Sequence, residues 1–153
     1  MSYLKNFLIQ FLSAFLLAIA GVFFVFTLST TIGFICQDTL GDLAYSFRGE
    51  GAFFIATLVG FPLGASFGVF FAKKLFSRRH RFVAFCIITA FVSGVLAIWF
   101  FALYFIDIVG AAGATQIIVV LLIAIIASLT AYNLAELLLR KFSNSLKIKK
   151  QPA

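Results

Sequence analysis

Ionisable and amide side chains gather near the end of the last apolar segment of the sequence. Asn133 and Glu136 are three residues apart, and Arg140 follows Glu136 by four, so all three lie on one face of a helix. An ionisable group inside a membrane segment is a functional candidate by default. An i,i+4 ion pair between Glu136 and Arg140 at headgroup depth would account for the same residues without a function. The sequence leaves both interpretations open.

Basic residues follow this segment and also the second apolar segment. Cations at a membrane face attract the phosphates of anionic lipids, so these residues form a candidate lipid-phosphate site. The candidate set is Lys73, Lys74, Arg78, Arg79, Asn133, Glu136, Arg140 and Lys141. Lys and Arg at the ends of apolar segments also set topology, which is the alternative role for the cations. The net charge of +7 is explained in this way, and we expect no nucleic-acid partner.

The sequence contains no arrangement of residues that is typical of an enzyme. It has no nucleophile beside a base, no paired carboxylates at a membrane face and no glycine-rich phosphate loop. One histidine and two distant cysteines, Cys36 and Cys86, are too few for a structural metal site. We therefore expect a non-enzymatic protein with no metal and no cofactor.

The candidate residues are carried by apolar segments that are long enough to cross a bilayer. The composition is 63% hydrophobic, which indicates a membrane protein. We predict an all-α integral membrane fold, a bundle of four transmembrane helices that forms one domain over residues 1–153. The predicted helices are residues 7–31, 52–72, 82–106 and 114–139. The first helix also resembles a cleavable signal peptide, but its apolar run continues to Leu28, which favours a retained helix.

The second predicted helix has a small residue at every fourth position. The members of this small-residue row are Ala52, Ala56, Gly60, Gly64, Gly68 and Ala72. Residues four apart share one helix face, and small residues let two backbones approach closely in lipid. We predict that the row packs against another helix. Pro62 lies within the same helix and predicts the loss of one backbone hydrogen bond and a kink.

The distribution of charge predicts the orientation of the chain. Basic clusters lie after the second and fourth helices, whereas the first loop carries Asp38, Asp42 and Glu50. The positive-inside rule then places both termini in the cytoplasm, in a multi-pass protein of the inner membrane, with Arg48 as the exception. Cys36 and Cys86 fall toward opposite faces, so we expect no disulfide between them. Hydrophobic spacing within this loop, at Leu40, Leu43, Ala44 and Phe47, predicts a short amphipathic helix on the membrane surface.

The two halves of the sequence resemble each other. The second helix ends in KKLFS at residues 73–77, and the fourth ends in RKFS at residues 140–143. Each half reads as an out-and-back helical hairpin, and two hairpins of the same orientation imply a pseudo-twofold axis along the membrane normal. Chance similarity between apolar segments is the alternative.

This layout resembles the GtrA-like family of small four-helix membrane proteins. Members often end the second and fourth helices in an Asn, a short apolar run, basic residues and an aromatic residue. The similar residues here are Asn133, Arg140, Lys141 and Phe142 in the fourth helix and Lys73, Lys74 and Phe76 in the second. No Asn precedes the second group, and the long first loop is a further departure. The resemblance implies a protein that assists translocation or presentation of polyprenyl-phosphate-linked sugars in polysaccharide biosynthesis.

Two functions therefore follow from the sequence. The first is the translocation or presentation of a lipid-linked sugar, with membrane lipid and polyprenyl phosphate as binding partners. The second is a packing or assembly subunit of a larger membrane complex, indicated by small residues on all four helices. The second function requires some of those small residues to point outward. In either case we expect a homo-oligomer or a membrane-protein partner.

Overall fold

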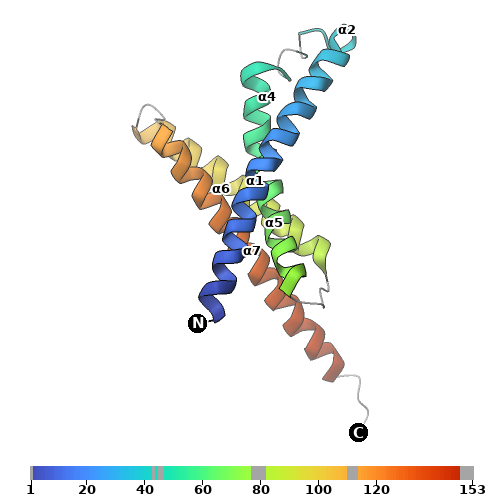
Figure 1. The fold of residues 1–153 in the computed structure, drawn as a ribbon, viewed down its shortest axis with the longest axis vertical. Helices are drawn as coiled ribbons and strands as arrows, with labels where there is room; N and C mark the ends of the chain where they lie inside the picture. The colour runs from blue at the N-terminus through green and yellow to red at the C-terminus, as the bar shows by residue number, and fades with distance from the viewer. Residues whose placement is uncertain (1, 43, 45–46, 77–81, 110–113, 149–153) are drawn as a thin grey trace.

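The computed structural model describes residues 2–42, 44, 47–76, 82–109 and 114–148, and every element in these ranges is a helix (Figure 1). The long helices are α1 (Ser2–Ile35), α5 (Phe61–Phe76), α6 (Val83–Val109) and α7 (Ala114–Ile148). The short ones are α2 (Gln37–Leu40), α4 (Gly49–Ile55) and the π-helical turn η1 (Ala56–Gly60). Within these described ranges, four segments are long and apolar enough to cross a membrane: Leu4–Ile35, Gly49–Lys74, Val83–Phe101 and Ile117–Ser143. The chain is an all-helical, multi-pass membrane protein.

The first and last helices are longer than the sequence pattern predicts. α1 has 34 residues and α7 has 35, whereas the predictions were residues 7–31 and 114–139. At 1.5 Å per residue each helix is about 50 Å long, which exceeds the roughly 30 Å hydrocarbon core of a bilayer. α7 continues past Arg140 because residues 141–148 include neither Gly nor Pro. Its last turns therefore extend beyond the membrane core.

The second span consists of three consecutive helical segments, α4, η1 and α5. At the junction the Phe61 N–H donates to the carbonyl of Ala56, five residues earlier. Pro62 follows directly, has no N–H to donate and carries a ring that crowds the carbonyl four residues before it. A wider π turn before a proline relieves this crowding. The disturbance expected at Pro62 thus takes the form of a π turn between two α-helical segments.

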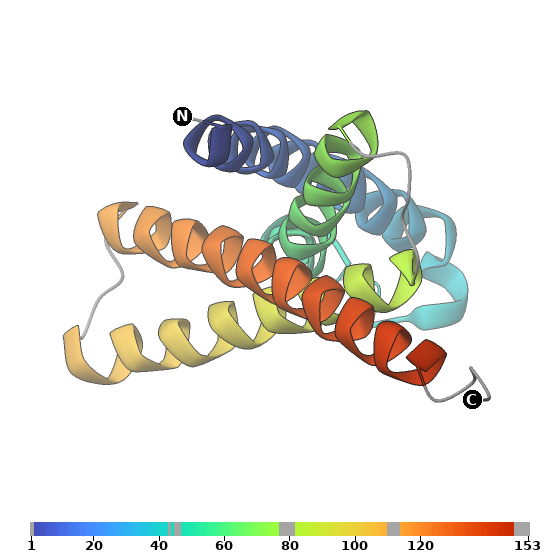
Figure 2. The ribbon, with the colours of Figure 1, turned by 90° about the horizontal axis from the view of Figure 1, so that it is seen from below.

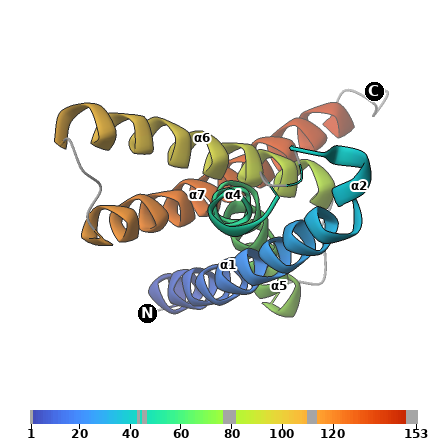
Figure 3. The same ribbon diagram turned by 90° about the horizontal axis from the view of Figure 1, so that it is seen from above.

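The four spans form two antiparallel hairpins that cross each other (Figure 1). α1 pairs with the second span, and α6 pairs with α7. When the molecule is seen along its length, α4 lies between α1 and the α6–α7 pair, whereas α5 crosses α1 and its end extends past it (Figures 2 and 3). α1 begins at the same end of the molecule at which α5 and α7 finish. We call this the basic end, because the sequence places most cations there.

The small-residue row lies buried against α1 where the two helices cross. A Cβ atom at Gly64 would stand 2.0 Å from the carbonyl oxygen of Leu17. One at Gly60 would stand 2.5 Å from the carbonyl oxygen of Gly21. At Gly68 the nearest atoms also belong to the α1 backbone. These positions allow no side chain, so the glycines bring two backbones into direct contact.

The two hairpins meet at the middle of the second span. A Cβ atom at Gly94 of α6 would stand 2.5 Å from the Ser128 hydroxyl oxygen and 2.9 Å from Cβ of Pro62. Gly94 therefore lets α6 approach α7 and the proline at once. Large apolar side chains such as Phe23 and Phe100 are 68% and 67% exposed on the outside, where lipid would cover them.

Arg48, the exception in the charge pattern, contacts the C-terminal end of α1, opposite the basic end. Its Nε and Nη2 donate to the carbonyl of Gly33 at 3.0 and 2.5 Å, and Nη2 also donates to Oε1 of Gln37 at 2.8 Å. Its guanidinium carbon lies 4.1 Å from the Phe34 ring centroid. The last carbonyls of a helix lack intrahelical partners and carry partial negative charge. Arg48 thus serves α1 as a C-terminal cap.

The amphipathic helix expected in the first loop falls largely outside the described residues, which include neither Leu43 nor residues 45 and 46. In the described part of this loop, α2 is a single helical turn and Ala44 is helical. Ala44 is 1% exposed and its backbone packs against Gly33 of α1. Ser29 donates to the carbonyl of Phe47 at 3.3 Å. The described part of the loop therefore folds back onto α1.

Candidate functional site

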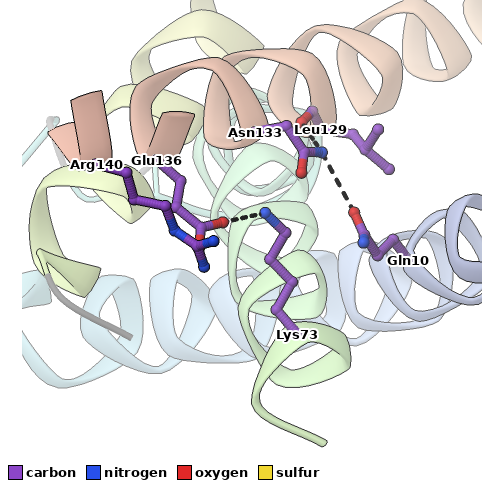
Figure 4. A network of polar contacts seen from close by, with 6 residues as sticks. All are labelled: Gln10, Lys73, Leu129, Asn133, Glu136 and Arg140. Atoms are coloured by element: carbon purple, nitrogen blue, oxygen red, sulfur yellow. Dashed lines mark hydrogen bonds and ion pairs between the residues drawn. The ribbon is translucent and has the colours of Figure 1, made fainter. Parts of the chain in front are cut away.

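Polar side chains from three helices meet near the basic end (Figure 4). α7 contributes Asn133, Glu136 and Arg140 from one face, because positions spaced by three and four residues align along a helix. α5 contributes Lys73 from its last turn, and α1 contributes Gln10. We call these five residues the polar cluster.

Glu136 is the centre of the charged part of this cluster. Its Oε2 accepts a hydrogen bond from Nζ of Lys73, and its Oε1 accepts one from Nη2 of Arg140 at 2.5 Å. The Glu136 and Lys73 side chains are 12% and 13% exposed, whereas the Arg140 side chain is 62% exposed. The expected i,i+4 ion pair is present, and Lys73 adds a shielded partner from another helix.

An aromatic ring also holds the Lys73 ammonium. Nζ of Lys73 lies 4.9 Å from the centroid of the Tyr132 ring, within the range of a cation–π contact. Tyr132 is 1% exposed and belongs to the core between the hairpins. Lys73 is therefore fixed between a buried ring and a carboxylate, and its positive charge is largely balanced by these contacts within the protein.

The amides of Asn133 and Gln10 join α7 to α1. Nδ2 of Asn133 donates to Oε1 of Gln10 at 3.3 Å and to the carbonyl of Leu129 at 2.8 Å. The candidate set did not contain Gln10. The side-chain amide of a residue in an otherwise apolar helix tends to hydrogen-bond to another helix. The position of Gln10 in the apolar first helix was therefore a signal that it takes part in an interhelical contact.

The remaining candidates lie apart from the polar cluster or outside the described residues. Lys74 and Lys141 are exposed, and Nζ of Lys74 lies 5.9 Å from the Phe70 ring centroid. Arg78 and Arg79 lie outside the described residues. The structure thus brings together four of the eight candidates.

The polar cluster is suited to binding an anion. Its two cations and one carboxylate leave a net charge of +1. Nη2 of Arg140 donates a hydrogen bond to Glu136. The exposed guanidinium has further N–H donors, and two of them can bind two phosphate oxygens at once. Among the residues that the structure describes, no three His, Cys, Asp or Glu side chains are grouped so that they could hold a metal ion.

No family model, no curated protein and no solved structure matches the chain.

Proposed function

We propose that this chain is a non-enzymatic protein of the cytoplasmic (inner) membrane that presents polyprenyl-phosphate-linked sugars for translocation. The observation that carries the proposal is the exposed Arg140 guanidinium, which is held by Glu136 beside the shielded Lys73. The resemblance to the GtrA-like layout supports the choice of substrate class.

Arg140 supplies the geometry that a lipid phosphate requires. A guanidinium offers paired donors to phosphate oxygens, and the contact with Glu136 limits the conformations of the side chain. Lys74 and Lys141 are exposed near the ends of α5 and α7, respectively. Each cation near an anionic membrane surface contributes about 1 kcal/mol of attraction. The phosphate would then bind at headgroup depth while the polyprenyl chain lies along the apolar helices.

The proposed orientation places the basic end in the cytoplasm. The described cations of this end lie on α1, α5 and α7, and Arg48 at the opposite end is used as a helix cap. The positive-inside rule counts cations near the ends of spans, so this distribution supports cytoplasmic termini.

The alternative function, an assembly subunit, depends on small residues that point outward. Small residues from all four spans instead line the interior and are at most 5% exposed: Ala14, Ala18, Ala52, Ala56, Ala65, Ala72, Ala90, Ala124 and Ala135. The outside is lined mainly by large apolar side chains, and Ala20 and Ala84 are exposed small residues among them. We favour the lipid-presenting function for this reason.

Native mass spectrometry of the purified protein with a polyprenyl phosphosugar tests the proposal. We expect wild type to retain the lipid and Arg140→Gln to bind it about fivefold more weakly. Lys5→Gln is the matched control, because it removes an exposed cation from the start of α1, outside the polar cluster. A wild type that retains no lipid, or equal losses in the two variants, would contradict the proposal.

A further inference from the structure

The polar cluster contains two cations and one carboxylate. This balance of charges affects whether the cluster binds singly or doubly charged phosphates more tightly. We propose that Glu136 shifts the preference of the cluster toward phosphodiester lipids and away from phosphomonoester lipids. The inference rests on the proposed function and specifies the substrate class of the same site.

The geometry divides the charges of the cluster into a shielded part and an accessible part. Glu136 and Lys73 are 12% and 13% exposed and bind each other inside the protein. Arg140 is 62% exposed and presents the single remaining positive charge to the headgroup region. A phosphate that binds Arg140 therefore lies near the Glu136 carboxylate, because the same guanidinium holds both groups.

The two lipid classes differ in charge. A sugar-linked polyprenyl phosphate is a phosphodiester with one negative charge, whereas a phosphomonoester carries about −1.5 to −2 at pH 7. Like charges a few ångströms apart repel, so the carboxylate disfavours the second charge of the monoester. A presenting protein would thereby bind the sugar-loaded lipid in preference to the unloaded one.

Exposed cations of the basic end outside the polar cluster act on both lipids. Lys74 and Lys141 attract any anionic headgroup, and they attract the monoester more strongly because it carries more charge. The informative quantity is therefore the change in the ratio of the two affinities when Glu136 is altered. A purely structural role for Glu136, tying α5 to α7, would not move this ratio.

The experiment measures binding to nanodiscs of phosphatidylcholine that carry either a polyprenyl monophosphate or a polyprenyl phosphoglucose. In Glu136→Gln we expect the affinity ratio to shift toward the monoester by about fivefold, equivalent to about 1 kcal/mol. Glu136→Asp keeps the charge and should keep the wild-type ratio. Glu50→Gln removes an equal charge from the opposite end of the second span and should leave the ratio unchanged.

A double variant separates charge from folding. Lys73→Met combined with Glu136→Gln removes one charge of each sign, so the cluster keeps its net charge and the ratio should return to the wild-type value. An unchanged ratio in Glu136→Gln would overturn the inference while the proposed function stands. If wild type binds neither lipid, the proposed function fails and the inference falls with it. Displacement of the lipid by excess inorganic phosphate would also overturn it, because the cluster would then recognise free phosphate.

Discussion

The carboxylate of Glu136 on α7 accepts a hydrogen bond from the ammonium of Lys73 on α5, which joins the two hairpins at the basic end. These residues are 63 positions apart in the sequence, and both side chains are largely shielded. The contact fixes the position of α7 relative to the second span. It therefore also positions Arg140, which shares the same carboxylate.

Removing one partner of this ion pair should destabilise the protein. Lys73→Met leaves a shielded carboxylate with Arg140 as its remaining partner in the polar cluster. We expect a loss of about 1–3 kcal/mol, between the values typical of exposed and of fully buried pairs. The measurement is unfolding in detergent micelles. Lys73→Met combined with Glu136→Leu should be closer to wild type, because no unpaired charge remains; a larger loss in the double variant would contradict the account.

The glycines of the small-residue row allow no side chain. Gly64→Ala places a Cβ atom against the α1 backbone, and overpacking of this kind typically costs about 1–3 kcal/mol. Leu63→Ala is the control, because its side chain is partly exposed beside the row. Thermal unfolding in detergent compares the two. Equal stability would show that the row does not form a tight interface.

The orientation can be tested with cysteine labelling. In intact cells, a membrane-impermeant thiol reagent should label Cys36, which is partly exposed at the end opposite to the basic end. Cys86 is a poor reporter because it is 1% exposed in the core. Ser145→Cys, near the end of α7, serves as the reporter in its place and should react only after the cells are permeabilised. Labelling of Ser145→Cys in intact cells at the rate of Cys36 would contradict cytoplasmic termini.

The helix cap made by Arg48 should act locally. Arg48→Gln removes the donors to the Gly33 carbonyl, so the last turn of α1 and the adjacent loop should open more often. We expect faster amide hydrogen exchange in residues 30–42 and little change near the crossing of the helices. Uniform acceleration along all of α1 would show that Arg48 supports the whole bundle instead.

The four spans were predictable because hydropathy and a period of 3.6 residues are local properties of the sequence. The placement of Glu136 beside Arg140 was predictable for the same reason, since their spacing is within one helix. The pairing of Glu136 with Lys73 was not, because it depends on how two helices are rotated about their own axes. The role of Gln10 depends on the same rotation.

Other features depended on local geometry that residue types do not specify. Pro62 predicts a disturbed helix, but the choice of a π turn over a sharp kink depends on how the turn packs against α1 and α6. Arg48 read as an exception in the charge pattern, and its contact with Gly33 required the path of the first loop. α7 continues to Ile148, past the end of the apolar run. The helix was predicted to end at residue 139 because the apolar run ends there.

Photocrosslinking is the most direct test of whether a lipid phosphate binds at the polar cluster. A polyprenyl phosphosugar with a photoreactive group next to the phosphate would be reconstituted with wild-type protein, irradiated and mapped by mass spectrometry. We expect adducts concentrated on residues 133–141 of α7 and on the last turn of α5, and we expect them to be lost in Arg140→Gln. Adducts spread along the lipid-facing surfaces of α1 and α6, with no change in Arg140→Gln, would contradict binding at the polar cluster.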